Sequence, residues 1–265
     1  MNKTVMKTVM ALIAIGLAQL LRAQTTEVMV VVDLSTSTLG EYQGTSFQEM
    51  ELLFVEQFTN GLDNSAKCGF SAFAGQWSNA CPPAAGRIQT KGMLSLLRAE
   101  KDCTKTGRME DGTAIYSALL HASTALGGQA NPRSILLLTD GSDNRSNISA
   151  SLITQWLQDR KIRVDVVGFS CLGNVDYPMM TGDSVKYIQM PSNQDYQEVT
   201  RIAEATNGVF VRVTQKGDIA KAVQQILESI RRGAIPTTPP PTGYIHERMK
   251  RWLQDRIAKE EIQLF

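Results

Sequence analysis

The sequence predicts a doubly wound α/β domain whose mostly parallel six-stranded sheet carries helices on both faces. From Glu27 to Ile230, strand signals alternate with helix signals, which is the order typical of a parallel sheet covered by helices. Residues 134–140 (SILLLTD) form an almost unbroken apolar run, as expected of a central strand buried on both faces. Of the 265 residues, 43% are hydrophobic, enough for one sizeable core.

The individual elements follow from local patterns. After a first strand over residues 28–32, five apolar residues at helical spacing predict a helix that stops at Asn60 and Gly61: Phe47, Met50, Leu53, Phe54 and Phe58. The next segments in chain order are strand 68–74, a short helix 91–99, helix 112–128 and strand 134–140. Helix 150–160, strand 162–169, helix 194–206, strand 208–213 and helix 217–230 complete the domain.

The N-terminal segment 1–23 has the pattern of a secretory signal peptide. Lys3 and Lys7 precede an apolar run over residues 9–18, which is short for a membrane span. We expect cleavage after Ala23, although Leu21 and Arg22 depart from the preferred small residues, so an uncleaved anchor is the alternative. The protein is therefore expected to be exported, to the periplasm or the extracellular space.

Export has consequences for charge and for the cysteines. Without residues 1–23 the chain loses three basic residues and no acidic one, and its formal net charge changes from +1 to −2. A nucleic-acid partner is therefore not expected. In an oxidising compartment disulfides are plausible, and Cys81 with Cys103 is the favoured pair, while Cys68 is expected to be buried and unbridged.

Two aspartates mark the carboxyl edge of the predicted sheet. Asp33 and Asp140 each directly end an apolar strand, where ligands bind in folds of this class. Two carboxylates at neighbouring strand ends repel each other unless a cation lies between them. The loop after Asp33 offers the hydroxyls of Ser35 and Ser37. Thr113, at the start of the predicted helix 112–128, offers a third. These hard oxygen donors favour Mg²⁺, with Mn²⁺ or Ca²⁺ as alternatives, over zinc or copper.

The same residues carry a family resemblance. Asp33-Leu34-Ser35-Thr36-Ser37, Thr113 within GTAIYSAL and Asp140 within LLLTDG resemble the metal-ion-dependent adhesion site of von Willebrand factor type A domains, which is also found in integrin I domains. The resemblance spans roughly residues 26–231 and implies that domain's Rossmann-like fold.

This resemblance also implies roles for the five residues. Ser35, Ser37 and Thr113 would bind the ion directly, while Asp33 and Asp140 would hold it directly or through water. A vacant coordination position would accept an Asp or Glu carboxylate from a partner protein. The implied function is metal-dependent protein binding, as an adhesion or assembly scaffold, and no enzyme activity.

Two other functions are considered. A metal-dependent hydrolase would need a base near the ion, but His121 lies in a predicted apolar helix and His246 in the tail. Asp143 is expected to form a turn or cap a helix. The third interpretation is a structural module whose metal site is vestigial.

Residues 170–192 form the longest predicted loop, which suggests a role in partner recognition. Tyr177, Pro178, Met179 and Met180 would supply an apolar contact next to the ion, or else anchor the loop to the core.

The C-terminal region changes character abruptly. Residues 232–243 form a proline-rich linker, and residues 244–265 predict an amphipathic helix with a strongly charged face. We favour a second protein contact through this helix, because an isolated helix of this length needs something to bury its apolar stripe. Self-association, packing on its own domain and contact with a membrane surface are alternatives, the last not favoured.

Overall fold

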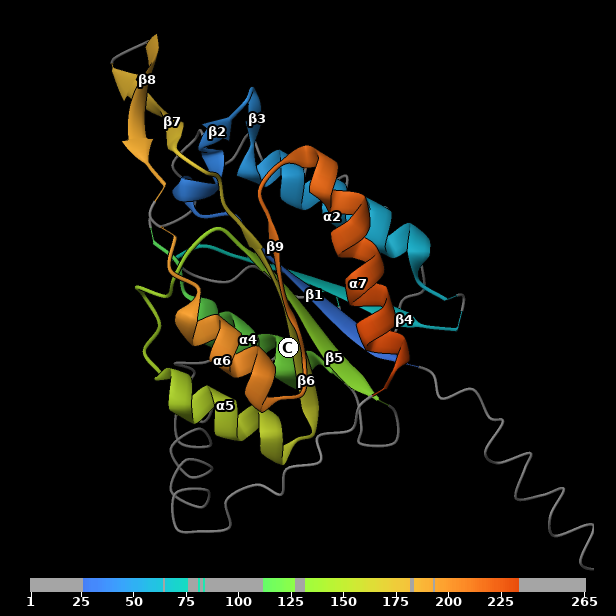
Figure 1. The fold of residues 1–265 in the computed structure, drawn as a ribbon. Coiled ribbons are helices and arrows are strands. Elements are labelled where there is room, and N and C mark those ends of the chain that lie inside the picture. Colours follow the sequence, from blue (N-terminus) through green and yellow to red (C-terminus); the bar gives the residue numbers. More distant parts are fainter. Residues whose placement is uncertain are drawn as a thin grey trace, which may run out of the picture.

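The computed structural model describes residues 26–63, 65–75, 81, 83, 112–126, 132–181, 184–192 and 194–233. Within these ranges a twisted central sheet runs through the molecule between two layers of helices (Figure 1). Its strand order is β4-β1-β5-β6-β9 and every pair is parallel. The strands are β1 (Glu27–Asp33), β4 (Lys67–Phe73), β5 (Arg133–Thr139), β6 (Ile162–Phe169) and β9 (Phe210–Val213).

This architecture confirms the predicted α/β fold. From β1 the chain first builds β4 on one side and then returns to build β5 on the other, so the strand order reverses at β1. The described residues contribute five strands to this sheet, where the sequence predicted six. The other described strands pair with one another in a separate antiparallel sheet.

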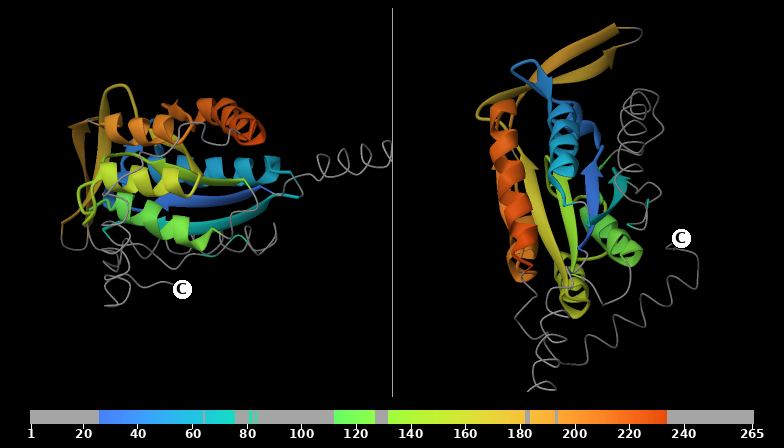
Figure 2. Two further views of the ribbon diagram at one scale, coloured as in Figure 1. Left: turned by 90° about the horizontal axis from the view of Figure 1, so that it is seen from below. Right: turned by 90° about the vertical axis from the view of Figure 1, so that its right-hand side faces the viewer.

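Helices cover both faces of the central sheet (Figure 2). The helices α2 (Phe47–Gly61) and α7 (Ile219–Arg231) pack on one face, and α4 (Ile115–Ala125), α5 (Ala150–Asp159) and α6 (Gln197–Ala205) on the other. Alternate residues of β1 serve the two layers: Val30 packs with the α2 side and Val31 with the α4 side. The sheet is thus buried on both faces, as its apolar strands predicted.

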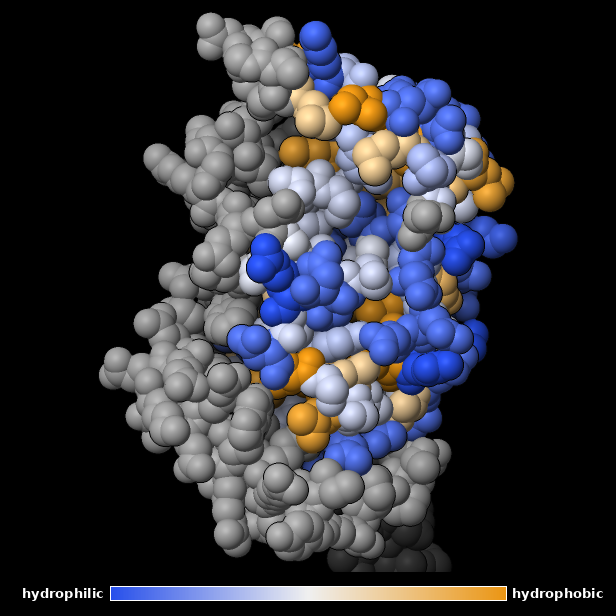
Figure 3. Space-filling view, turned by 90° about the vertical axis from the view of Figure 1, so that its left-hand side faces the viewer, coloured by the Kyte–Doolittle hydropathy of each residue, from blue (hydrophilic) through white to orange (hydrophobic). Residues whose placement is uncertain are grey.

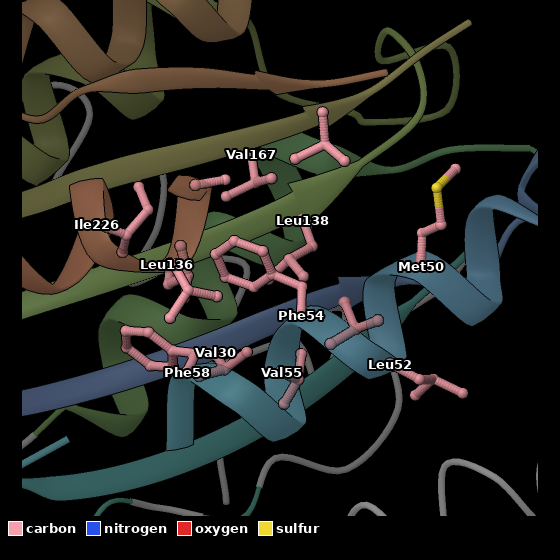
Figure 4. Packing of buried hydrophobic residues seen from close by; sticks show 14 of the residues in the cluster. Val30, Met50, Leu52, Phe54, Val55, Phe58, Leu136, Leu138, Val167 and Ile226 are labelled. Carbon is pink, nitrogen blue, oxygen red and sulfur yellow. The ribbon is translucent and has the colours of Figure 1, made fainter. Parts of the chain in front are cut away.

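Aromatic side chains fill the core beneath α2 (Figure 4). The rings of Phe54 and Phe58 stack with centroids 6.3 Å apart, and Phe54 meets Phe169 of β6 edge-on at 6.4 Å. Ser46 caps the helix, because its side chain accepts a hydrogen bond from the backbone N–H of Glu49. The apolar spacing of the sequence thus places α2 where predicted, and Gly61 is its last residue.

The predicted loop 170–192 is instead largely a β-hairpin. Strands β7 (Asn174–Thr181) and β8 (Ser184–Pro191) pair along their whole length. They extend a small antiparallel sheet of order β3-β2-β7-β8, in which β2 is Glu41–Tyr42 and β3 is Thr45–Ser46. Pro178 concealed this hairpin in the sequence, since proline argues against a strand. Here it lies past Asp176, the one residue of β7 that pairs with β2, so it occupies a strand edge where proline is tolerated.

Several other predictions concern residues outside the described ranges. The signal peptide, helix 91–99, the linker beyond Gly233 and helix 244–265 lie outside the described residues. No disulfide joins Cys68, Cys81 and Cys171 to one another, and Cys103, the expected partner of Cys81, is also outside those ranges. In the part of the chain that the structure covers, every helix is too short or too polar to cross a bilayer.

A glycine allows β9 to join the sheet. A Cβ atom on Gly208 would lie 1.7 Å from the carbonyl oxygen of Val164 in β6. We therefore expect Gly208→Ala to force β6 and β9 apart and lower the free energy of unfolding by about 2–3 kcal/mol, measured by urea denaturation. Gly217→Ala is the matched control, because its nearest neighbouring atom would be 4.0 Å away. Equal stability of the two variants would refute this account of the β6–β9 contact.

Candidate metal centre

The two predicted aspartates meet at the carboxyl edge of the sheet. Asp33 is the last residue of β1, and Asp140 directly follows β5, the strand paired with β1. Their exposed fractions are 0% and 2%. The pair lies where the strand order reverses, the position at which open α/β sheets bind ligands.

Hydrogen bonds hold the turn after β1 against β5. Asp33 accepts one bond at Oδ1 from the N–H of Ser35 (2.9 Å) and one at Oδ2 from the hydroxyl of Thr139 (2.7 Å). The short 3-10 helix η1 (Thr36–Leu39) starts immediately after Ser35, and the hydroxyl of Thr38 donates to the carbonyl of Ser35. The backbone therefore turns sharply enough to bring the next serine back toward the strand ends.

The serine hydroxyls complete a continuous network. The Oγ atoms of Ser35 and Ser37 lie 3.0 Å apart, and Ser37 Oγ donates to Asp140 Oδ1 at 2.8 Å. Asp33, Ser35, Ser37 and Asp140 are thus joined by hydrogen bonds, and we call these four residues the serine–carboxylate network. The second oxygen of Asp140, Oδ2, is buried and accepts no hydrogen bond from the residues that the structure describes.

Thr113 is positioned by a different route. It lies just before α4, and its backbone exchanges two hydrogen bonds with Asn144: Thr113 N–H donates to Asn144 Oδ1 (2.8 Å), and Asn144 N–H donates to the Thr113 carbonyl (3.0 Å). These two bonds hold Thr113 against the loop that begins at Asp140. No hydrogen bond in the described residues joins the Thr113 hydroxyl directly to the serine–carboxylate network.

The same loop caps α4. Asp143 accepts a hydrogen bond from the backbone N–H of Tyr116 (2.9 Å) and is braced by Ser146, whose hydroxyl accepts from the N–H of Ser117. This confirms the capping role expected of Asp143. Asn144 and Ser146 were not predicted as supporting residues, although the polar run after Asp140 was the available signal.

Burial changes the acidity of both aspartates. It raises the pKa of Asp33 to about 6, against the hydrogen bonds from Ser35 and Thr139, which lower it. The pKa of Asp140 rises to about 8, first through burial and then through the charge of Asp33. No basic side chain forms a salt bridge with either one in the described part of the chain.

The donors fit a hard divalent cation. Two carboxylates and two hydroxyls converge, and a carboxylate oxygen in their midst lacks a partner. Within the described ranges no three His, Cys, Asp or Glu side chains are grouped to hold a metal, so a cation here would depend on neutral hydroxyl oxygens. Such ligands leave much of the cation's charge available to a further acidic group.

Comparison with known proteins agrees with this geometry. A family model described as von Willebrand factor type A domain matches residues 28–142. A search among curated proteins found no match.

Solved structures resemble the fold. An aerotolerance-related membrane protein from Bacteroides fragilis NCTC 9343 has a TM-score of 0.62 at 23% identity, covering 77% of this chain and 98% of that one. The conserved hypothetical protein BatB from Bacteroides thetaiotaomicron has a TM-score of 0.62 at 21% identity, with coverages of 78% and 99%. The proximal thread matrix protein 1 of the mussel byssus, whose structure has a zinc-occupied MIDAS motif, has a TM-score of 0.56 at 14% identity, with coverages of 78% and 48%.

The raised pKa values of Asp33 and Asp140 predict how stability depends on pH when divalent cations are removed. In the folded protein the pKa values of Asp33 and Asp140 are about 6 and 8, against an ordinary 3.8. Their protonated forms therefore favour folding at low pH, and this contribution is lost as the pH rises through both values. We expect the free energy of unfolding in EDTA to fall as the pH rises from about 4, near the ordinary pKa of the two carboxyls, to about 8, measured by urea denaturation.

The control for this measurement is Asp140→Asn, which keeps the shape of the side chain but cannot ionise. Its stability should depend less steeply on pH over the same range. Parallel curves for the two proteins would contradict the assignment.

Proposed function

Because this chain carries a von Willebrand factor type A domain, we propose that it is an adhesion or assembly module that binds an acidic residue of a partner protein through Mg²⁺. Ser35, Ser37 and Thr113 would bind the ion directly, and Asp33 and Asp140 would hold it directly or through water. The observation that carries the proposal is the hydrogen bond from Ser37 Oγ to Asp140 Oδ1, which joins two separate segments of the motif. The bound ion supplies an electrophilic position for a carboxylate.

The choice of Mg²⁺ rests on the donors. All five proposed ligands offer oxygen, which favours Mg²⁺ and leaves Mn²⁺ or Ca²⁺ as alternatives. The zinc-occupied motif of the mussel protein makes Zn²⁺ a necessary competitor in any binding experiment. A hydrolase is not favoured: His121 is buried within α4 at 3% exposure, and Asp143 is engaged in capping.

An apolar surface next to the network supports a protein ligand. A Cβ atom on Gly40, at the end of η1, would touch Val175 and Tyr177 of β7, so the hairpin packs on the turn that carries the two serines. Several large hydrophobic side chains near this hairpin are exposed: Leu172, Met179, Val185, Tyr187, Ile188 and Met190. We call these six residues the hairpin patch. The pairing of β7 with β8 places Met179, Ile188 and Met190 on one face of the hairpin and Val185 and Tyr187 on the other. Figure 3 shows hydrophobic residues in the upper part of the face in view and also lower down, among hydrophilic ones.

The exposure of the hairpin side chains bears on the predicted apolar contact of residues 177–180 next to the ion. Met179 is exposed, whereas Tyr177 and Pro178 are half-buried, and nothing is described of the Met180 side chain. We propose that the partner contact extends from the ion onto Met179 and β8. The preferred ligand would then be a peptide segment with an acidic residue flanked by apolar ones.

The location and the tail complete the proposal. We propose that the protein is exported and acts in the periplasm or outside the cell, which fits the similar fold of the aerotolerance-related membrane protein from Bacteroides fragilis. The C-terminal helix 244–265 would make a second protein contact. Membrane-surface contact is the less favoured alternative.

The metal-dependent capture is testable with immobilised peptides that carry a central Asp or Glu, beside otherwise identical peptides with Asn or Gln. In Mg²⁺ the protein should bind the acidic peptides, and EDTA should release it, because the carboxylate completes the ion's coordination. Ser37→Ala should weaken Mg²⁺ affinity, measured by calorimetry, about 10- to 100-fold. Ser151→Ala, an exposed serine of α5, is the matched control.

Binding of acidic peptides that persists in EDTA would favour a structural module with a vestigial site. An EDTA-sensitive phosphatase or peptidase rate that Ser37→Ala removes would favour the hydrolase.

The hairpin patch can be tested separately from the ion. The double variant Ile188→Ser with Met190→Ser should weaken binding of the acidic peptides about tenfold and leave Mg²⁺ affinity unchanged, because both side chains are exposed on the face of the hairpin that carries Met179. Peptide affinity by fluorescence anisotropy and Mg²⁺ affinity by calorimetry separate the two effects. Unaltered peptide binding would remove the hairpin from the proposed interface.

A further inference from the structure

Helix α2 places an acidic residue in the middle of its buried face. Phe47, Glu51, Phe54 and Phe58 follow one another at helical spacing and all are 0% exposed. Gln48, one turn before Glu51, is also fully buried. Neither side chain was singled out by the sequence, because the surrounding apolar residues account for the helix without them.

The polar atoms of both side chains lack partners. Glu51 Oε1 and Oε2 and Gln48 Oε1 and Nε2 are all buried without a hydrogen bond. In native proteins such atoms almost always bond to protein, ordered water or an ion. An apolar side chain at either position would avoid the cost of desolvation, and the unsatisfied atoms are of the kind that ordered water or a hydrated ion satisfies.

The start of α2 adjoins the serine–carboxylate network. The first residue of α2 is bound to the turn, since Phe47 N–H donates to the carbonyl of Gly40 at the end of η1 (3.1 Å). The helix also packs on β1 and β6, and its Phe54 contacts Phe169, the last residue of β6. Glu51 therefore lies one turn along the helix from the segment that carries Ser35 and Ser37.

Electrostatics point to the same location. The charges of Asp33 and Asp140 add to burial in raising the pKa of Glu51 well above its ordinary range. The Tyr196 hydroxyl, which donates to the Phe169 carbonyl at the end of β6, has a pKa raised by burial and by all three of these carboxylates. Glu51 is thus near enough to Asp33 and Asp140 for their charges to interact, and no salt bridge is made to any of the three in the described part of the chain.

We propose that Glu51, with Gln48 beside it, forms the inner wall of the metal centre and holds the water shell of the hard dication that the serine–carboxylate network binds. The inference rests on the proposed metal binding and adds a third carboxylate to it. Glu51 acts through water, because it does not group with Asp33 and Asp140 as a direct ligand set in the described residues. It is a positioning residue, and its negative charge raises the affinity for a dication.

The test is Glu51→Gln, which keeps the size of the side chain and removes its charge, compared with Glu49→Gln, an exposed acid on the same helix. Calorimetry with MgCl₂ and with MnCl₂ on the protein with residues 1–265 measures the affinities. We expect Glu51→Gln to weaken both about tenfold and Glu49→Gln to leave them unchanged. In EDTA, the melting temperature of Glu51→Gln should be equal to or higher than that of the wild type, because a buried carboxylate is removed from two others.

A second variant protects the test against misfolding. Glu51→Met fills the same space without a polar atom, and it should also lose Mg²⁺ affinity while it stays folded in EDTA. If the wild type binds Mg²⁺ and both Glu51 variants bind it equally well, this inference is overturned and the proposed function stands. If the wild type binds no divalent cation, both are overturned.

Discussion

Carboxylates buried at the carboxyl edge of a parallel sheet are the constraint on which this molecule's site depends. Parallel strands place their final residues at one edge, and at this edge the side chains of Asp33 and Asp140 are buried. Asp33 and Asp140 therefore gain no solvation, and their mutual repulsion must be met by hydrogen bonds, by protons or by a cation. The hydroxyls of Ser37 and Thr139 each donate a hydrogen bond that stabilises one of the two carboxylates. Oδ2 of Asp140 receives no such bond within the described residues, so part of the repulsion is left uncompensated.

The surrounding structure holds these charges in place. The loop after Asp140 caps α4 through Asp143 and keeps Thr113 at the same edge through Asn144. On the opposite layer, α2 starts against the turn that carries Ser35 and Ser37. Each segment of the motif is therefore fixed by a helix terminus, which preorganises the oxygens before any ligand arrives.

The outward and inward sides of this edge differ in chemistry. Outward, the hairpin β7–β8 presents exposed apolar side chains beside the two-serine turn, a composition suited to protein contact. Inward, Glu51 and Gln48 are buried and unsatisfied, a composition suited to water and charge. The proposed ion would lie between the two, with its open coordination position facing the partner and its hydration held from within.

The sequence by itself determined the α/β class, nearly all of the central strands and helices, and the residues of the serine–carboxylate network, because periodic apolar runs and strand-ending aspartates are local signals. It also indicated the capping role of Asp143. Only the tertiary structure decided the hairpin, since proline is tolerated at position 178, where β7 pairs with β8 but no longer with β2. The same is true of Asn144 beside Thr113 and of Glu51 near Asp33, because these pairs are distant in the chain and meet only when the helices pack on the sheet.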